Sequence, residues 1–411
     1  MDYERILSPT PKMTTLRVLL HVAAQRDYEL HSLDFSTAFL HGSVHEEIWS
    51  RRPPGFTESF PAGTQWSLRR PVYGHCQAPH EWHDTLKTTL AALGFAPATA
   101  DPSLFLRTDT SLPPFYVLVY VDDLVFATAD TEAMTLLKLE LQKKHTCTDL
   151  GELRSHLGLQ ITRDKAQRTI TLTKSHMVHQ VLQRFGFQFS SPQPTPLSTS
   201  HSLSAPPSDE SIEPCGPYPE LTPKGALGCC EEGTALLVQY VRHAARAWRT
   251  GSSCPHQSRR RFLGGRLSYA AVVTGLHLQP WFRLCFLALY PLVFGSQPSC
   301  EAEIYAGAMA AQELRWLTYL LTDLGEQPCS PPVLYIDNKA MIALCQEHGL
   351  EHKTKHIAQQ YFLARELQQR GQLRLAYVAT RANTANIFTK ALPPGDHQRF
   401  VTVLGLVPTF P

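Results

Sequence analysis

The stretch FYVLVYVDDLVFATAD, residues 115–130, decides the fold because it sets two acids between two apolar runs. Asp122 and Asp123 interrupt a pattern typical of a buried β-hairpin. Two adjacent carboxylates in such a place cost stability unless something neutralises them. Asp34 ends another strand-like run, so its carboxylate joins the pair if the strands are neighbours. Such oxygen ligands suit Mg²⁺ with substrate phosphates, whereas an ordinary Asp-containing turn is the simpler alternative.

Helical and strand-like patterns alternate along the chain, which predicts an α+β fold. We expect helices within residues 13–30, 80–94 and 175–187, the last of which ends at Gly186, and a helix over 131–144 capped by Thr131. The runs LGLQITRD and RTITLTK predict a hairpin. Farther on, we expect a long helix over 301–325, a strand at 331–338, a helix at 355–370 and a strand at 372–380.

Composition sets only broad bounds on function. The 411 residues are 43% apolar with a net charge of +2, which permits two or three domains and a nucleic-acid partner. Scattered cysteines and the lack of a signal peptide predict reduced thiols in an intracellular, cytoplasmic or nuclear protein. The apolar run at 281–294 contains Arg283 and Pro291 and is too short for a membrane span, so no membrane partner is expected. The group of Cys229, Cys230, Cys254 and His256 has no zinc-site spacing.

Several motifs, taken in order, carry a resemblance to a known family. LDFSTAFLHGSVHEEIW, RRPVYGHCQAPHEWHDTL, ADPSLFL and LVYVDDLVFAT, followed by DLGELRSHLGLQITR and HMVHQVLQRFGF, resemble the reverse transcriptase of copia-type retrotransposons. SCEAEIYAGAMAAQELRWL, LYIDNKAMIAL, TKHIAQQYFLARE and YVATRANTANIFTKAL resemble the ribonuclease H region of the same polyprotein. The resemblance covers roughly residues 1–222 and 299–400.

The resemblance implies roles for particular residues and partners. Asp34 and Asp122 match the metal-binding carboxylates of a polymerase palm, with Asp123 beside them, and imply two Mg²⁺ ions, or Mn²⁺, as cofactors. Phe39 matches the aromatic residue that excludes a 2′-hydroxyl, Gln77 the polar residue near the incoming nucleotide and Tyr120 the residue beside the primer end. The implied partners are an RNA or DNA template with its primer and dNTPs. Without the resemblance, these three would be a core phenylalanine, a loop glutamine and a strand tyrosine.

In the ribonuclease H-like part, the resemblance implies a degenerate metal site. Glu303 and Asp337 match two of its acids, whereas Asn386 stands where the family has its last acid. Without the resemblance, Glu303 is a favourable helix start and Asp337 a helix cap. No Asp occurs between residues 224 and 298, where the leading strand is expected. We therefore predict no ribonuclease H activity, and a domain that lacks its leading hairpin and exposes a strand edge.

The resemblance also sets the predicted domain organisation. We expect a polymerase palm with truncated fingers and a partial thumb over residues 1–190, its antiparallel sheet backed by helices. A Ser/Pro-rich linker at 191–223 leads to an Arg-rich segment at 224–298, whose pattern is consistent with a shifted reading frame. An incomplete ribonuclease H-like α/β region at 299–392 and a tail at 393–411 complete the chain.

Three functional hypotheses follow. The first is an RNA-directed DNA polymerase of the copia type, truncated in its fingers. The second is a non-enzymatic remnant of a retrotransposon polyprotein that at most binds nucleic acid without specificity. The third, a separate metal nuclease, is weaker because its set of acids is incomplete. The residues predict no particular oligomeric state.

Overall fold

A computed structural model describes residues 8–42, 44, 47–51, 65–189, 195–196, 268–279, 282–292, 299–328, 330–346, 358–388 and 391–406. The chain divides into two compact units, which are described separately. Unit 1 comprises residues 1–172 with 319–326, and unit 2 comprises residues 173–318 and 327–411. Most of the predicted linker and of the Arg-rich segment up to residue 267 lies outside the described residues.

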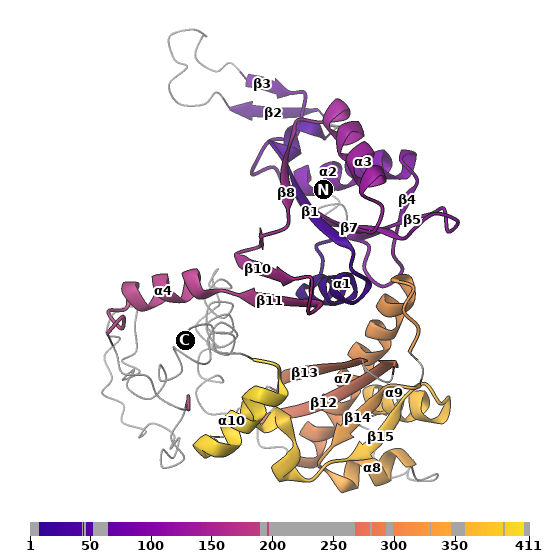
Figure 1. Cartoon of the computed structure of the whole chain (residues 1–411), viewed down its shortest axis with the longest axis vertical. Coiled ribbons are helices and arrows are strands. Elements are labelled where there is room, and N and C mark those ends of the chain that lie inside the picture. The colour runs from indigo at the N-terminus through magenta and orange to yellow at the C-terminus, as the bar shows by residue number, and fades with distance from the viewer. Residues whose placement is uncertain are drawn as a thin grey trace. The chain divides into compact units, whose positions relative to one another are not determined.

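Unit 1 is built on a six-stranded antiparallel sheet (Figure 1). Its strands, in spatial order, are β4 (Phe95–Pro97), β5 (Leu104–Arg107), β6 (Phe115–Tyr120), β7 (Asp123–Thr128), β1 (Glu29–Phe35) and β8 (Cys147–Glu152). The predicted hairpin around the acid pair is confirmed as β6 and β7, and β1 lies beside β7.

One face of this sheet is covered by two helices. Side chains of α2 (Ala78–Ala92) and α3 (Thr131–Lys144) share a single core with alternate residues of the strands. Trp82 and Leu86 of α2 pack there with Leu33 and Phe35 of β1, and all four are almost fully buried. Because successive strand residues point to opposite faces, the residues between these core positions project from the other face.

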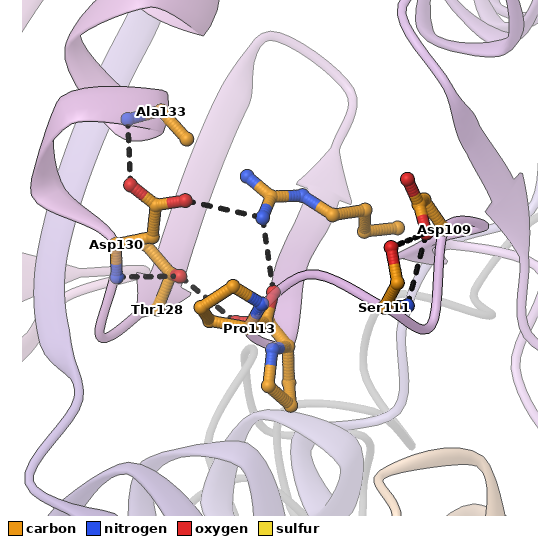
Figure 2. Close-up of polar contacts among 8 residues, drawn as sticks. Asp109, Ser111, Pro113, Thr128, Asp130 and Ala133 are labelled. Atoms are coloured by element: carbon orange, nitrogen blue, oxygen red, sulfur yellow. Dashed lines mark hydrogen bonds and ion pairs between the residues drawn. The ribbon is translucent and has the colours of Figure 1, made fainter.

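The start of α3 is fixed by a network of side chains at the base of the β6–β7 hairpin (Figure 2). The carboxylate of Asp130 accepts a hydrogen bond of 2.9 Å from the backbone N–H of Ala133 and forms a 3.2 Å ion pair with Arg107. The same guanidinium donates to the carbonyl oxygen of Pro113 at 3.0 Å. The N-cap of α3 is therefore Asp130, and the prediction of Thr131 was wrong. A carboxylate one residue earlier satisfies the free N–H groups and favours the positive end of the helix.

The remaining elements of unit 1 are smaller. Helix α1 (Met13–Arg26) packs against β7 and is buried along most of its surface. Strands β2 (Ile48–Arg51) and β3 (Gln65–Leu68) form a two-stranded ribbon, and β9 (Ser155–His156), β10 (Leu159–Asp164) and β11 (Thr169–Thr173) form a three-stranded sheet. The predicted pairing of LGLQITRD with RTITLTK is thus confirmed. Residues 319–326 belong to this unit, where the Tyr116 hydroxyl donates to the carbonyl oxygen of Leu324 at 2.8 Å.

Unit 2 contains a four-stranded mixed sheet in the order β13-β12-β14-β15. Strands β12 (Ser268–Gln279) and β13 (Phe282–Leu292) form an antiparallel hairpin, and β12 also pairs with β14 (Val333–Ile336). Strand β14 is parallel to β15 (Arg374–Tyr377). The expectation that this region lacks a leading hairpin was wrong. Long alternating and apolar runs formed strands there although the segment lacks the expected Asp.

Unit 2 also contains helices and 3₁₀ turns. They are α4 (Ser175–Arg184), α7 (Ser299–Asp323, whose last residues belong to unit 1), α8 (Lys339–Gln346), α9 (Ala358–Gln369), η4 (Thr380–Ala382), η5 (Thr384–Phe388) and α10 (Pro394–Val403). Gly186 ends α4 as predicted: its φ is 72°, and the N–H of Phe187 donates back to the carbonyl oxygen of Leu182. Helix α10 lies within the predicted tail, where Phe400 and Val401 pack with Ile387.

Candidate active site

Three aspartates meet where β1 and the β6–β7 hairpin lie side by side. Asp34 of β1 is directly opposite Asp123 of β7, and Asp122 precedes it in the hairpin turn. Leu33 and Phe35 point into the helix-covered core, so Asp34 and its cross-strand partner project from the opposite face. All three acids are partly exposed. The strands predicted to be neighbours are neighbours, and we call Asp34, Asp122 and Asp123 the carboxylate cluster.

The turn that carries Asp122 has an unusual backbone. Tyr120 pairs with Asp123, so Val121 and Asp122 form a two-residue loop. Val121 has a φ of 57°, in a region that a β-branched residue rarely adopts and that costs on the order of 1–3 kcal/mol. Glycine is the usual residue at the first position of such a turn. The surrounding structure therefore has to hold this conformation in place.

Two hydrogen bonds hold the turn. The indole N–H of Trp82 donates to the carbonyl oxygen of Val121 at 2.6 Å, and the backbone N–H of Phe35 donates to the carbonyl oxygen of Asp122 at 2.8 Å. Trp82 is 1% exposed and its ring packs edge-on against Phe35, with centroids 4.9 Å apart. Two residues of the buried core, Trp82 and Phe35, thus form hydrogen bonds with the turn that bears Asp122.

The carboxylate cluster is electrostatically crowded. The pKa of Asp123 is raised to about 6, mainly by burial and in addition by the charges of Asp122 and Asp34. Burial also raises the pKa of the neighbouring Cys147 thiol to about 11, with added effects from Asp149 and Asp34. Within the described ranges, no group of three or more His, Cys, Asp or Glu side chains is already arranged as a metal site. A hard cation here would therefore need further oxygen ligands, such as the phosphates of a substrate.

The aromatic and amide residues predicted near the nucleotide lie on neighbouring elements. Phe39 belongs to the 3₁₀ helix η2 (Ala38–His41), and its half-buried ring lies 4.6 Å from the ring of the exposed Tyr73. Gln77 is the half-buried N-cap residue of α2 and makes no capping hydrogen bond with its side chain. The two elements approach closely because Gly42 has no side chain: a Cβ there would lie 3.3 Å from the Cβ of Glu81.

Tyr120 lies on the same face as the carboxylate cluster, because it is the cross-strand partner of Asp123. Its ring meets the ring of His156 edge-on, with centroids 6.3 Å apart. His156 is 5% exposed, and burial lowers its pKa to about 4. The β9 strand therefore places a neutral imidazole beside the tyrosine predicted to lie at the primer end.

The second predicted site lies at the edge of the unit 2 sheet. Asp337 follows β14, and Asn386 belongs to η5 after the parallel strand β15, so both come after the carboxyl ends of neighbouring strands. The cap of α8 is Asn338, whose side-chain oxygen accepts from the N–H of Met341 at 3.2 Å, so Asp337 is not used as the cap. The side-chain amide of Asn386 is buried and donates to the carbonyl oxygen of Thr380. Glu303 lies in α7, but its side chain is outside the described residues.

Comparison with known proteins places these features in a family. Residues 1–199 match the family model described as reverse transcriptase (RNA-dependent DNA polymerase). This part of the chain is therefore similar to reverse transcriptase domains. The match agrees with the antiparallel sheet and helices of unit 1 and with the resemblance inferred from the sequence motifs.

The relatives of the whole chain are transposon polyproteins. The chain is 28% identical to the retrovirus-related Pol polyprotein from transposon RE2 of Arabidopsis thaliana, over 99% of this chain and 30% of that protein. It is 25% identical to the corresponding polyprotein from transposon TNT 1-94 of Nicotiana tabacum, over 99% of this chain and 33% of that protein. A putative transposon Ty5-1 protein of Saccharomyces cerevisiae is 36% identical over 31% of this chain and 42% of its own length.

These matches confirm the resemblance to copia-type retrotransposon polyproteins. The chain spans about a third of the length of the two plant relatives, and the alignments extend across the Arg-rich segment that the motifs left out. No described helix is long and apolar enough to cross a bilayer, and the apolar run at 281–294 contributes strand β13.

Two residues that the sequence analysis did not single out belong to this site. Trp82 supports the turn and the ring of Tyr73 packs at a tilt against that of Phe39, although both lie within the motif RRPVYGHCQAPHEWHDTL. A tryptophan on the buried side of an amphipathic helix needs a partner for its N–H, which is the signal that could have drawn attention to it. Nothing local identifies the partner, because it lies 39 positions away.

Proposed function

We propose that the reverse transcriptase domain transfers nucleotides from dNTPs to the 3′-hydroxyl of a primer on an RNA or DNA template. The observation that carries this proposal is the register that sets Asp34 opposite Asp123, with Asp122 in the adjoining turn. It gathers three acids from separate parts of the chain on a partly exposed face. A cluster of this kind has no evident structural use, since like charges directly opposite each other destabilise a sheet.

The donor set fits a divalent cation. Asp34 and Asp122 would hold two Mg²⁺ or Mn²⁺ ions, with Asp123 beside them. When bound, such ions stabilise the attacking and leaving oxygens of a phosphoryl displacement. The raised pKa of Asp123 supports this role, because the burial and the neighbouring negative charges that favour a proton would also favour a cation.

The neighbouring residues would bind and orient the substrates. Phe39 would bring its ring against the sugar of the incoming nucleotide and disfavour a 2′-hydroxyl. The side chain of Gln77 makes no capping bond and would hydrogen-bond the nucleotide. Tyr120 would contact the primer end, supported by the neutral ring of His156. Each of these roles is implied by the family resemblance.

A primer-extension assay on poly(rA)/oligo(dT) with Mg²⁺ tests the proposal. We expect extension by the purified chain and its loss in the Asp122→Asn variant, which keeps the size of the side chain. If the folded protein does not extend the primer, the non-enzymatic remnant becomes the better description. A chain that binds the template–primer without extending it would give this result.

We also propose that the ribonuclease H-like region is inactive. The amide of Asn386 supports this, because it donates a hydrogen bond to the carbonyl oxygen of Thr380 in η4 and is a poorer metal ligand than a carboxylate. Incubating the purified chain with an RNA–DNA hybrid should give no cleavage of the RNA strand. Cleavage that is abolished by Glu303→Gln would contradict this proposal.

A further inference from the structure

The orientation of Asp122 depends on the two peptide groups that flank its Cα. The preceding peptide carries the Val121 carbonyl, and the following peptide carries the carbonyl of Asp122 itself. The first oxygen accepts the indole N–H of Trp82 at 2.6 Å, and the second accepts the backbone N–H of Phe35 at 2.8 Å. Holding both peptide planes fixes φ and ψ of Asp122 and therefore the direction of its Cα–Cβ bond, from which the carboxylate extends.

The Trp82 hydrogen bond acts on the strained side of the turn. Val121 has a φ of 57°, which a valine does not adopt by its own preference. A buried indole N–H without a partner is also unfavourable. The hydrogen bond links the strained turn to the buried indole. If the Val121–Asp122 peptide rotated out of its observed orientation, the indole N–H would lose its partner. The hydrogen bond thus opposes relaxation of the turn.

The position of Trp82 is itself tightly defined. Its ring is 1% exposed and is surrounded by the rings of Phe35, His41 and His145, with centroids 4.9, 5.9 and 5.5 Å away. The residue lies five positions after Gln77 on α2, the helix that begins at the predicted nucleotide side. A rigid helix therefore carries a hydrogen-bond donor to the metal-binding turn.

We propose that Trp82 is a positioning residue for nucleotidyl transfer: its indole N–H orients the Val121–Asp122 peptide and aims the Asp122 carboxylate at the metal. The inference rests on the proposed function of the carboxylate cluster. The competing role is packing alone, in which the ring fills the core and the N–H has no effect on the reaction. The two roles differ in what happens when the ring is kept and the donor is removed.

The test compares Trp82→Phe with Leu86→Ala, a buried residue one turn farther along the same helix. Mn²⁺ binding is measured by water-proton relaxation on protein with a dideoxy-terminated primer, template and dNTP, and single-nucleotide kinetics are measured in parallel. We expect Trp82→Phe to weaken Mn²⁺ binding and lower kcat by about tenfold each, as for loss of one buried hydrogen bond, with little change in the KM for dNTP. Leu86→Ala should change Mn²⁺ binding by less than about twofold at a similar loss of stability.

Two further variants keep the outcome decisive. Replacement of Trp82 by 3-benzothienylalanine preserves the ring shape and removes only the donor, so it serves if Trp82→Phe does not fold. Val121→Gly accepts a positive φ without strain, so it should restore part of the Mn²⁺ affinity lost in Trp82→Phe. Equal effects of Trp82→Phe and Leu86→Ala, or unchanged Mn²⁺ binding in the benzothienyl protein, would overturn the positioning role. A wild-type chain that neither extends a primer nor binds Mn²⁺ would instead overturn the proposed function.

Discussion

The carboxylate cluster of unit 1 and the edge of unit 2 that holds Asp337 and Asn386 use similar residue types in different ways. In unit 1, Asp34 and Asp123 are direct cross-strand partners and their charges interact. In unit 2, the amide of Asn386 is buried and donates a hydrogen bond to the carbonyl oxygen of Thr380 in the neighbouring η4. The first arrangement keeps unneutralised charge at a partly exposed surface, whereas the amide of Asn386 in the second is satisfied within the protein.

This difference separates a site that needs a ligand from a region that is stable without one. Crowded carboxylates are unfavourable in a folded protein unless a cation or a proton neutralises them. A buried amide with a hydrogen bond contributes to stability directly. If the comparison is correct, removing charge should harm function but improve metal-free stability in unit 1, and adding charge should only harm unit 2.

The largest effect is expected from Asp34→Asn. Loss of a carboxylate that we propose to hold the metal should reduce primer extension by about 1,000-fold or more, which corresponds to several kcal/mol of transition-state stabilisation. Glu132→Gln, an exposed acid in the first turn of α3, is the control and should leave extension unchanged. Single-turnover extension by both variants measures the difference. Substantial activity in Asp34→Asn would remove the carboxylate cluster from the mechanism.

The next largest effect is a loss of folding stability at acid pH that is caused by His156. Its pKa of about 4 in the folded state lies below the ordinary 6.5, so the unfolded chain binds the proton first as the pH falls. The free energy of unfolding is therefore unaffected by this group above pH 6.5. It decreases as the pH falls from 6.5 to about 4, by about 3 kcal/mol in total. His156→Phe keeps an aromatic ring and removes this dependence.

Hydrogen exchange in peptides from β9 and β10, measured at several pH values, follows the effect. The wild-type protein should lose protection below pH 6.5 more steeply than His156→Phe. Parallel pH profiles for the two proteins would show that the imidazole is not responsible.

A smaller effect is expected from Asn386→Asp in unit 2. The substitution removes the amide that donates to Thr380 and sets a carboxylate against a carbonyl oxygen, so it should destabilise unit 2 by about 2 kcal/mol. Hydrogen exchange in peptides around η5 measures the loss. Asn386→Gln, which keeps an amide, is the matched variant. If Asn386→Asp gained metal-dependent cleavage of an RNA–DNA hybrid, the edge of unit 2 would also be a metal site, and the proposed difference between the two units would be wrong.

The smallest effect is expected from Asp123→Asn without metal. The pKa of Asp123 is raised from 3.8 to about 6, so the folded state holds its proton longer than the unfolded chain as the pH rises. Stability is therefore lost between about pH 4 and 6, and the cost at neutral pH is about 1 kcal/mol after discounting for solvent screening. The variant should slow exchange in β6 and β7 at pH 7 in the presence of EDTA. An unchanged or faster exchange would show that the cluster is not strained by its charge.

Local sequence predicted much of the secondary structure because the signals are local. The apolar runs on both sides of Asp122 and Asp123 defined a hairpin, the helical spacing of Leu16 and Leu19 defined α1, and Gly186 supplied the positive φ that ends α4. The N-cap of α3 was misplaced by one residue, because Asp130 and Thr131 are both favourable caps. Only the contacts with Ala133 and Arg107 decide between them.

The leading hairpin of unit 2 was missed for a different reason. Its strands were judged by the absence of an expected Asp, but strand formation depends on apolar and β-branched residues that find pairing partners. Strand β12 is stabilised as an element of the sheet by pairing with β13 on one side and with β14 on the other. The pairing with β14 joins residues about 60 positions apart, and no local pattern specifies it.

By itself, the sequence determined which residues are candidates for the chemistry and which elements bear them: two adjacent acids in an apolar hairpin, a third acid at the end of a strand, and an amide where an acid was expected. Only the tertiary structure decided that β1 pairs with β7, that Asp34 lies opposite Asp123, and that the indole of Trp82 holds the turn. The physical reason is that strand register and buried hydrogen bonds between distant segments depend on how the whole core packs. Local propensities do not contain that information.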